Sequence, residues 1–188
     1  ADKKWAPVQD TFLHDPNLPI GGAKWNDICI KCHAVAGRPG IDSRTRTMNT
    51  EIAELGISCE ACHGPAKKHI AHYQNPANRY VTHLTGKSVH AILNPGKETL
   101  DHRLSTQVCG QCHSVFDFDN DRQHRRWATH GFSYQPGDQL GSDRMMITYE
   151  NADPIYRYTK YWPDGHVRVN GREFNSLEAS SYYQNGDF

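Results

Sequence analysis

The sequence predicts a mainly α-helical and irregular fold, in which short helices alternate with long loops and a small β-hairpin lies near the C-terminus. Three observations lead to this prediction. One five-residue pattern, Cys-x-x-Cys-His, occurs three times and uses all six cysteines. The mean hydropathy of −0.77 is too polar for an ordinary side-chain core in a chain of 188 residues. Glycine and proline also interrupt long stretches that lack a regular hydrophobic period.

Each copy of the pattern is expected to lie on a short helix, because residues three positions apart project from the same side of about one helical turn. Asn26 or Asp27 offers an N-cap to the first of these helices. Pro65 suits the first turn of a further helix that runs to about Asn75. Ser105 is a candidate cap for the helix that carries the third copy.

The remaining segments predict irregular structure and one hairpin. Residues 1–24 are expected to form an irregular lead-in, and residues 80–103 a loop, because Gly and Pro interrupt both. Near the end, Ile155–Trp162 and His166–Val169 flank the turn sequence Pro163-Asp164-Gly165. Their aromatic and β-branched side chains favour two short strands joined by that turn.

Cys-x-x-Cys-His is the pattern at which haem c is attached covalently. Two thiols add to the vinyl groups on one edge of a porphyrin, so they must project together, and the histidine that follows donates a ring nitrogen to iron. We therefore expect three haem c groups held by residues 1–150, with residues 151–188 forming a hairpin and aromatic segment packed on the same domain. The predicted attachment residues are Cys29, Cys32 and His33, then Cys59, Cys62 and His63, then Cys109, Cys112 and His113.

Two other interpretations of a Cys-x-x-Cys pair are weaker. Structural zinc takes four ligands and would pair two of the motifs, which leaves the third stranded and does not explain the repeated histidine. A redox-active thiol pair would occur once, within a βαβ pattern, and the sequence shows none. Covalent haem is the interpretation that explains all three copies.

Composition and charge limit the function. Three porphyrins would supply the apolar material that the side chains lack, so the chain without haem is expected to be largely unfolded. Lys plus Arg equal Asp plus Glu at 21 each, and propionates would add negative charge, which disfavours a nucleic-acid partner. There is no run of about 18 apolar residues that would span a membrane. Because c-type haem is attached outside the energy-transducing membrane, we expect an exported protein, periplasmic or extracellular, whose signal has been removed.

The sixth ligand of each iron must come from outside the motifs. Nine other histidines compete with three methionines, which favours bis-histidine coordination and low potentials. His69 is a candidate for a neighbouring haem, because six helical residues span only about 9 Å from His63, too little to pass round a porphyrin. The further candidates are His102 and His14, with His72 as a substitute for His69 and with His90 and His130 in reserve.

An acidic run offers a secondary cofactor expectation. Asp117, Asp119 and Asp121 alternate as they do at the start of a calcium loop. The sixth position is Arg122 rather than Gly and the twelfth is Ala128 rather than Glu, which excludes an EF-hand. An irregular calcium site remains as an alternative to a solvated acidic turn.

Several segments together resemble bacterial multihaem c-type cytochromes, most closely the large ones that carry tetratricopeptide repeats. The resemblance implies an exported electron carrier, and it supports His69 as an axial ligand because Cys-His-Gly-Pro-x-x-x-His has that role in similar proteins. Such proteins tend to carry another CxxCH soon after the segment like 171–175, whereas this sequence stops at Phe188. A short natural member and a fragment therefore both remain open. The segments are residues 25–35, 56–65 with His69, 108–114, 134–138, 164–168 and 171–175.

Three function hypotheses follow. The first is a trihaem electron carrier whose partners are other redox proteins. The second is a subunit of an extracellular cytochrome filament, a homopolymer built by head-to-tail contacts that do not close. The third is a small-molecule redox enzyme with one haem left open, which the many spare histidines disfavour.

Overall fold

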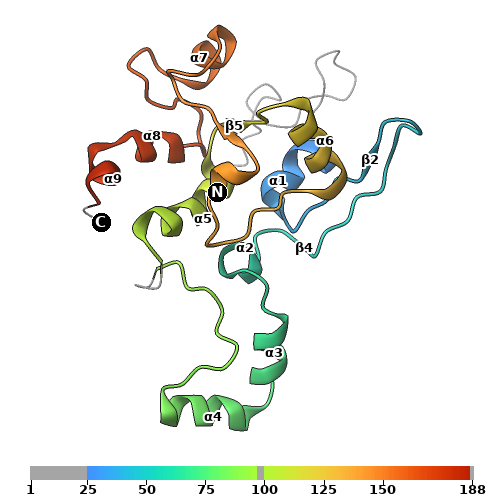
Figure 1. Ribbon diagram of the computed structural model, residues 1–188, viewed down its shortest axis with the longest axis vertical. Coiled ribbons are helices and arrows are strands. Elements are labelled where there is room, and N and C mark those ends of the chain that lie inside the picture. The colour runs from blue at the N-terminus through green and yellow to red at the C-terminus, as the bar shows by residue number, and fades with distance from the viewer. Residues whose placement is uncertain (1–24, 97–99, 187–188) are drawn as a thin grey trace, which may run out of the picture.

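The computed structural model describes residues 25–96 and 100–186. A body of short helices and loops carries one projecting arm, formed by α3 and α4 (Figure 1). The predicted fold class is confirmed: the chain is mainly helical, with very short strands and long irregular connections. The predicted division at residue 150 stays a prediction.

The elements in chain order are η2 (Trp25–Cys29), α1 (Ile30–His33), β1 (Ala34–Val35), β2 (Ile41–Asp42), β3 (Thr47–Met48), β4 (Glu54–Leu55), α2 (Cys59–His63), α3 (Lys67–Tyr73), α4 (Pro76–Thr85), α5 (His102–His113), β5 (Phe116–Asp117), α6 (Asp121–His130), η3 (Leu140–Ser142), β6 (Met145–Met146), α7 (Pro154–Lys160), α8 (Phe174–Ala179) and α9 (Ser181–Asn185).

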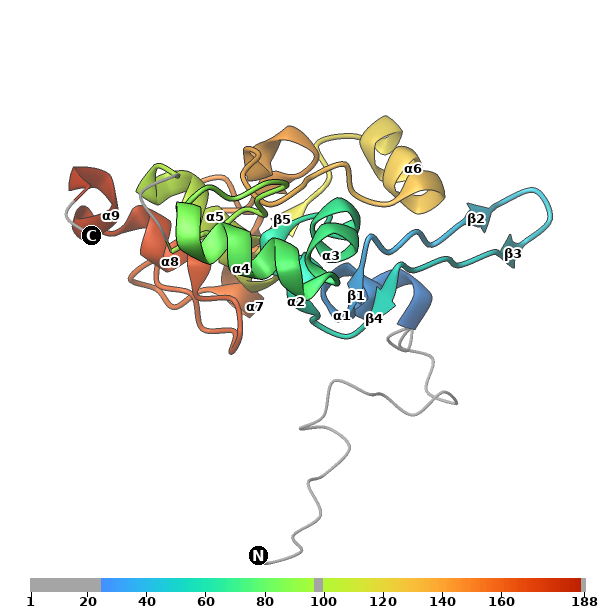
Figure 2. The same ribbon diagram turned by 90° about the horizontal axis from the view of Figure 1, so that it is seen from below.

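The strands of the described residues form two-stranded antiparallel pairs. β1 pairs with β4, β2 with β3 and β5 with β6. The β1–β4 pair sets Ala34 opposite Leu55, so it brings the end of the first motif beside the approach to the second. The β2–β3 hairpin reaches away from the body (Figure 2).

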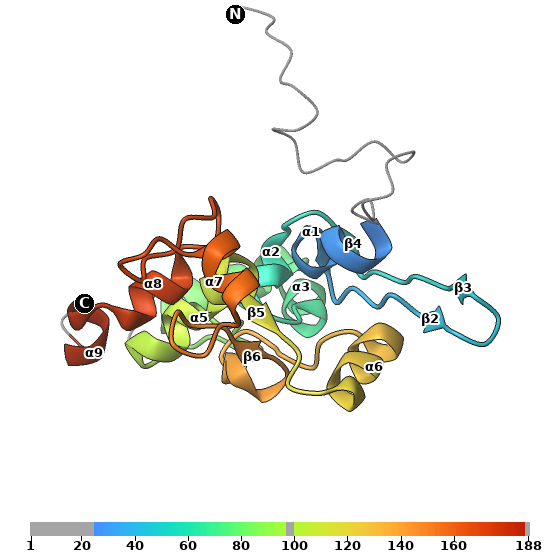
Figure 3. The same cartoon turned by 90° about the horizontal axis from the view of Figure 1, so that it is seen from above.

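Side-chain cores are small. One buried cluster holds Val115, Ile147, Ala152 and Tyr161, and a second is built on Tyr134, Leu140 and Phe174. Both lie around the segments that follow the third motif, and Figure 3 shows α5, α7, α8 and β6 gathered on that side of the body. Many large apolar side chains elsewhere remain exposed, as expected if part of the core is not protein.

The arm contains a helix, α4, part of which was predicted as loop. Residues 80–85, predicted as loop, belong to α4, because Asn75 caps the helix by accepting a hydrogen bond from the Ala77 amide at 3.0 Å and Pro76 occupies its first turn. The helix faces the rest of the arm with polar side chains: Thr82 bonds the Tyr73 hydroxyl at 3.2 Å, and Asn78 donates to the His72 carbonyl at 2.8 Å.

The outer face of α4 is apolar. Tyr80, Val81 and Leu84 are 68%, 57% and 68% exposed. This orientation reverses the usual arrangement, in which the apolar face of a surface helix turns towards the protein.

The predicted C-terminal hairpin is wrong in its first strand. Residues 155–160 belong to helix α7, which begins because Asp153 accepts a hydrogen bond from the Tyr156 amide at 2.8 Å and Pro154 takes the first helical position. The predicted turn does form: Tyr161 and Val167 make one antiparallel bridge, and the Trp162 amide donates to the His166 carbonyl at 2.7 Å. The hairpin is therefore reduced to a single bridge.

Two predicted caps are also wrong. α5 begins at His102, where the Asp101 side chain accepts a hydrogen bond from the Arg103 amide at 2.7 Å, so Ser105 lies inside the helix. The helical turn before α1 begins at Trp25, which places Asn26 and Asp27 within it rather than at its cap. The predicted lead-in over residues 1–24 lies outside the described residues.

Candidate haem-attachment site

The three motifs meet around the last turn of α5. The first motif touches the third through reciprocal sulfur–carbonyl contacts: Cys32 Sγ lies 3.7 Å from the Cys112 carbonyl oxygen, and Cys112 Sγ lies 4.0 Å from that of Cys32. The second motif is tied to the third by Gln111, whose Nε2 donates to the Ala61 carbonyl at 2.7 Å. Segments about 30, 60 and 110 residues along the chain thus converge on one helix end.

The first motif also contacts the segment that leads into the second. The Gly56 amide donates to the His33 carbonyl at 2.9 Å, next to the β1–β4 pair. All six cysteines are free thiols. Those of the second motif, Cys59 and Cys62, are exposed on α2, three residues apart on one turn, as attachment to one porphyrin edge requires.

The thiols influence one another. A hydrogen bond with Cys112 lowers the pKa of Cys32 to about 6, although burial opposes this shift and the nearby Arg172 supports it. The same contact and burial raise the pKa of Cys112. Burial raises the pKa of Cys62, and the nearby Cys109 and Cys59 thiols add to that effect.

Two of the three motif histidines have a partner that orients the ring. His63 Nδ1 lies 2.6 Å from the Leu93 carbonyl oxygen. Since a carbonyl only accepts, Nδ1 must carry the proton, which leaves Nε2 with its lone pair free for a metal. His113 Nδ1 lies 3.7 Å from the Glu173 carboxylate. Backbone amides, including that of Gly171, lower the pKa of the Glu173 carboxyl, and the His113 imidazole adds to this. His33 lies exposed at the end of α1.

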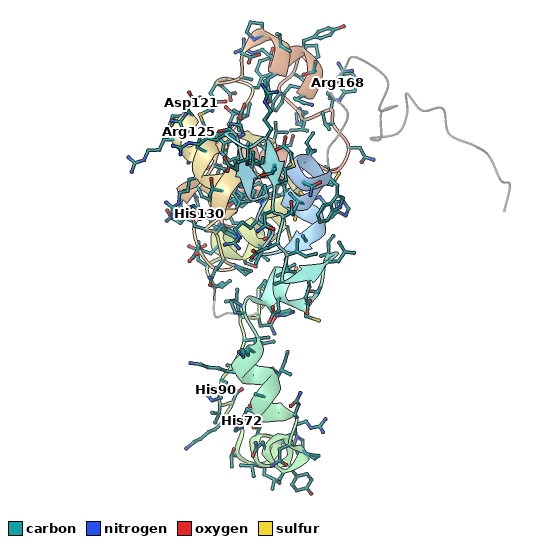
Figure 4. All side chains as sticks on the ribbon, turned by 90° about the vertical axis from the view of Figure 1, so that its right-hand side faces the viewer. His72, His90, Asp121, Arg125, His130 and Arg168 are labelled. Carbon is teal, nitrogen blue, oxygen red and sulfur yellow. The ribbon has the colours of Figure 1, made fainter. Side chains whose placement is uncertain are left out.

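The predicted sixth ligands are dispersed. His69 lies on α3, and its Nδ1 donates to the His90 carbonyl at 3.0 Å, which again leaves Nε2 available. His72 and His90 lie close together on the arm, with ring centroids 5.6 Å apart (Figure 4). His90 has a positive φ of 53°, a conformation that non-glycine residues seldom adopt. His130 ends α6 on the body, away from the arm (Figure 4).

The other two candidates gain less support. His102 lies at the opposite end of α5 from the third motif. Its Nδ1 is 3.2 Å from the Asp101 carboxylate and its Nε2 is 3.3 Å from the Tyr183 carbonyl. Both ring nitrogens therefore have protein partners. His14 lies outside the described residues.

Two arginines that were not among the predicted site residues hold the third motif in place. Arg172 Nη1 donates to the carbonyls of Cys112 at 2.6 Å and Ser114 at 3.0 Å. Arg144, which is 2% exposed, donates to the Gln111 carbonyl at 3.0 Å and pairs with Asp143 at 2.9 Å. Arg172 lies in residues 171–175, one of the segments that resemble multihaem cytochromes, so the sequence offered a signal for it. No sequence signal pointed to Arg144.

The expected calcium site finds no support. Asp117 accepts hydrogen bonds from the Phe118 amide and the Tyr156 hydroxyl. Asp119 accepts a hydrogen bond from the Asn120 amide group, and Asp121 pairs with an arginine. Over residues 25–96 and 100–186, no group of three or more His, Cys, Asp and Glu side chains is arranged to hold a metal ion.

The donor set fits covalently attached haem. Paired thiols stand on single helical turns, and His63 is held with its metal-binding nitrogen free. Paired thiols that can form thioether links to the vinyl groups, together with an imidazole that can bind iron, suit haem c, and no carboxylate cage competes with them in the described chain.

Comparison with known proteins gives a family match over part of the chain and a similarity to a solved structure. Residues 13–64, which contain the first two motifs, match the family model of cytochrome c554 and c-prime. No curated protein matches the sequence. Among solved structures, the crystal structure of the outer cell wall cytochrome OcwA is similar, at 23% sequence identity and a TM-score of 0.49, over 81% of this chain and 27% of that one. The chain thus spans little more than a quarter of OcwA.

Over the matched segment, which contains the first two motifs, the chain is similar to c-type cytochromes, and the motif that it repeats three times is the one at which haem c is attached. None of its described helices has the length and apolar character needed to cross a membrane.

Proposed function

We propose that the chain transfers electrons through three haem c groups, one at each CxxCH motif. The observation that carries the proposal is the convergence of the motifs on the end of α5, where Cys32 meets Cys112 and Gln111 binds Ala61. Attachment points this close would hold three rings in one group rather than at separate sites. Each haem, when bound, supplies an iron that gains and loses one electron.

The protein residues have distinct roles in this proposal. The cysteine pairs anchor the rings, and His33, His63 and His113 ligate iron from one side. The Leu93 carbonyl fixes the tautomer of His63 and increases the basicity of its Nε2. His69, oriented in the same way by the His90 carbonyl, is our leading sixth ligand. Bis-histidine ligation would keep the potentials low.

We expect an exported protein, periplasmic or extracellular, that exchanges electrons with other redox proteins. This part of the proposal rests on the site of c-type haem attachment and on the resemblance to exported multihaem cytochromes. Fractionation of the producing cells, with the haem-stained protein followed in each fraction, would test it. Its recovery only from the cytoplasm would contradict it.

Intact mass and EPR spectroscopy test the haem count. The holoprotein should carry three covalent haems, and each paired Cys→Ser variant of one motif should lose one. Because the third motif touches both others, Cys109→Ser with Cys112→Ser should alter the EPR signals of both remaining haems. Fewer than three haems in the holoprotein, or a motif whose Cys→Ser variant loses none, would reject a trihaem carrier. A dominant high-spin EPR signal that changes when cyanide is added would reject bis-histidine ligation.

A filament subunit is a second candidate, favoured by the outward apolar face of α4. Tyr80, Val81 and Leu84 would be covered by a second copy in such an assembly. Sedimentation and electron microscopy of the holoprotein at rising concentration test this, with Leu84→Gln as the variant expected to weaken assembly. Discrete monomers throughout would remove the filament candidate and leave the carrier intact.

A further inference from the structure

The outward face of α4 is a continuous apolar stripe. It consists of exposed residues at positions i, i+3, i+4 and i+7, which share one side of a helix: Ala77, Tyr80, Val81 and Leu84. The opposite side of the helix carries the polar groups that bond to the rest of the arm. The stripe is therefore one directed face and not a scatter of single apolar residues, which would need no explanation.

Haem at the three motifs would not cover this stripe. α4 lies at the far end of the arm, beyond α3, whereas α2, which carries the second motif, lies at the base of the arm (Figure 1). The bond between Thr82 and Tyr73 turns the polar side of α4 towards α3, so the stripe points away from it. A ring anchored on α2 would therefore meet the inner side of the arm. The stripe is available to a partner from outside the described chain.

The charge of the arm has one sign. Residues 61–96 contain no Asp or Glu, and their four Lys and Arg side chains are all exposed: Lys67, Lys68, Arg79 and Lys87. Within residues 25–96 and 100–186, no ion pair involves any of these four. Lys plus Arg equal Asp plus Glu in the whole sequence, so the excess of acidic side chains lies outside the arm. The arm is a basic projection on an otherwise acidic chain.

An anionic lipid surface fits the stripe and the charge together. An amphipathic helix lies in such a surface with its apolar side chains below the headgroups, while nearby Lys and Arg side chains meet the negative charge. Tyrosine, as at position 80, is enriched at this depth because its ring is apolar and its hydroxyl is polar. A protein partner would need contacts well beyond the stripe, because each side of a stable protein interface covers about 800 Å².

We propose that the tip of the arm docks on a membrane surface that is rich in anionic phospholipids. The stripe on α4 enters the headgroup region. Arg79, which directly precedes Tyr80, and Lys87, which follows the end of α4, pair with lipid phosphates, and the two lysines of α3 add to the attraction. The body, which carries the first and third motifs, stays outside the lipid. The proposal goes beyond the proposed electron-transfer function and does not depend on the number of haems.

Co-sedimentation of the full haem-loaded chain with lipid vesicles tests the proposal. One set of vesicles contains equal parts of phosphatidylcholine and phosphatidylglycerol, and the other contains phosphatidylcholine alone. We expect saturable binding to the anionic vesicles and at least about tenfold weaker binding to the neutral ones, because each basic side chain near an anionic surface contributes about a fivefold gain in affinity. Salt should weaken the binding, since the screening length falls from about 10 Å at 0.1 M to about 3 Å at 1 M.

Two arm variants, each with a matched control on the body, separate docking by the arm from general attraction. Leu84→Gln should weaken binding to the anionic vesicles about tenfold, and Arg79→Gln with Lys87→Gln should do the same. Their controls should bind like the parent protein: Ile155→Gln, at an exposed apolar position on α7, and Arg125→Gln with Arg126→Gln, at two exposed positions on α6. Far-UV circular dichroism and haem content verify that each variant is folded.

The proposal is overturned if the chain binds anionic vesicles no better than neutral ones, or if either arm variant binds like the parent protein. It is also overturned if a control variant loses as much binding as its matched arm variant. Sedimentation without vesicles identifies the competing occupant: if Leu84→Gln abolishes self-association but leaves vesicle binding intact, the stripe belongs to a second copy of the chain. None of these results alters the haem count, so the proposed electron-transfer function is judged separately.

Discussion

Asn175 should be among the most stabilising polar side chains of the body. It is 6% exposed at the start of α8. Its Oδ1 accepts from the Val115 amide at 2.6 Å, and its Nδ2 donates to the carbonyls of Val115 at 3.0 Å and Ile147 at 2.6 Å. One side chain therefore ties the segment after the third motif to β6 and to the C-terminal helices.

The Asn175→Ala variant removes all three hydrogen bonds and leaves the buried Val115 amide unpaired. At about 1 kcal/mol for each bond, the free energy of unfolding should fall by about 3 kcal/mol, with the orphaned amide able to add a further ~1 kcal/mol. For a chain of this size a loss of 3 kcal/mol corresponds to a fall in Tm of about 6–12 °C.

Guanidinium unfolding followed by far-UV circular dichroism measures the effect, because haem absorption would persist in an unfolded chain with covalent haem. Asn170→Ala, at an exposed position, is the matched control and should change the free energy of unfolding by less than about 0.5 kcal/mol. A loss below about 1 kcal/mol for Asn175→Ala would refute the reasoning.

Three further predictions concern the site and its support. A Cβ on Gly110 would lie 2.8 Å from the buried Phe174 ring, so Gly110→Ala should lower the free energy of unfolding by about 1–2 kcal/mol in a denaturant titration. Adding Phe174→Leu to this variant should relieve the loss. Unchanged stability of Gly110→Ala would contradict the contact. Burial, aided by the Glu150 carboxylate, raises the pKa of Tyr161 to about 12, above the ~10 of an unfolded tyrosine. Stability should therefore fall as pH rises from about 10 to 12, since the unfolded chain loses its proton first, and Tyr161→Phe should reduce that slope in denaturant midpoints; equal slopes would rule it out. His69→Met should raise the potential of one haem in a spectroelectrochemical titration, because a thioether replaces an imidazole, whereas three unaltered potentials would remove His69 from the ligand set.

Local sequence signals predicted the helices at and just after the second CxxCH motif better than they predicted α4 and α7. The spacing of Cys59 and Cys62 required a helical turn. The helix predicted from Pro65 to about Asn75 is observed as Lys67–Tyr73, with Pro65 before its N-cap Ala66 rather than in its first turn. The helices α4 and α7 were missed although both begin with a capping residue followed by proline, Asn75-Pro76 and Asp153-Pro154. In α7 the aromatic alternation suggested a strand, but a side-chain cap and the fixed φ of proline outweighed that preference.

The sequence alone indicates the candidate attachment residues, which stay a prediction, but it does not indicate how the structure arranges them. The meeting of Cys32 with Cys112 depends on contacts between residues 80 positions apart, which no local pattern encodes. Arg144 and Arg172 donate hydrogen bonds to backbone carbonyls. Because every residue has a backbone carbonyl, the sequence does not indicate which residues these arginines contact. The sixth ligands stay predictions. Nine histidines lie outside the motifs, and only the distances between folded elements could distinguish among them.

The hydrogen bond between His63 and Leu93 has a mechanical consequence. Leu93 lies on the strand of chain that returns from the arm to α5, while His63 ends α2 just before the arm departs (Figure 1). The bond therefore closes a loop of chain at the base of the arm, so a displacement of the arm would change the length of this bond. This bond influences how strongly the His63 imidazole would bind iron. A partner protein that binds the arm could therefore change the reduction potential of a haem attached at the second motif.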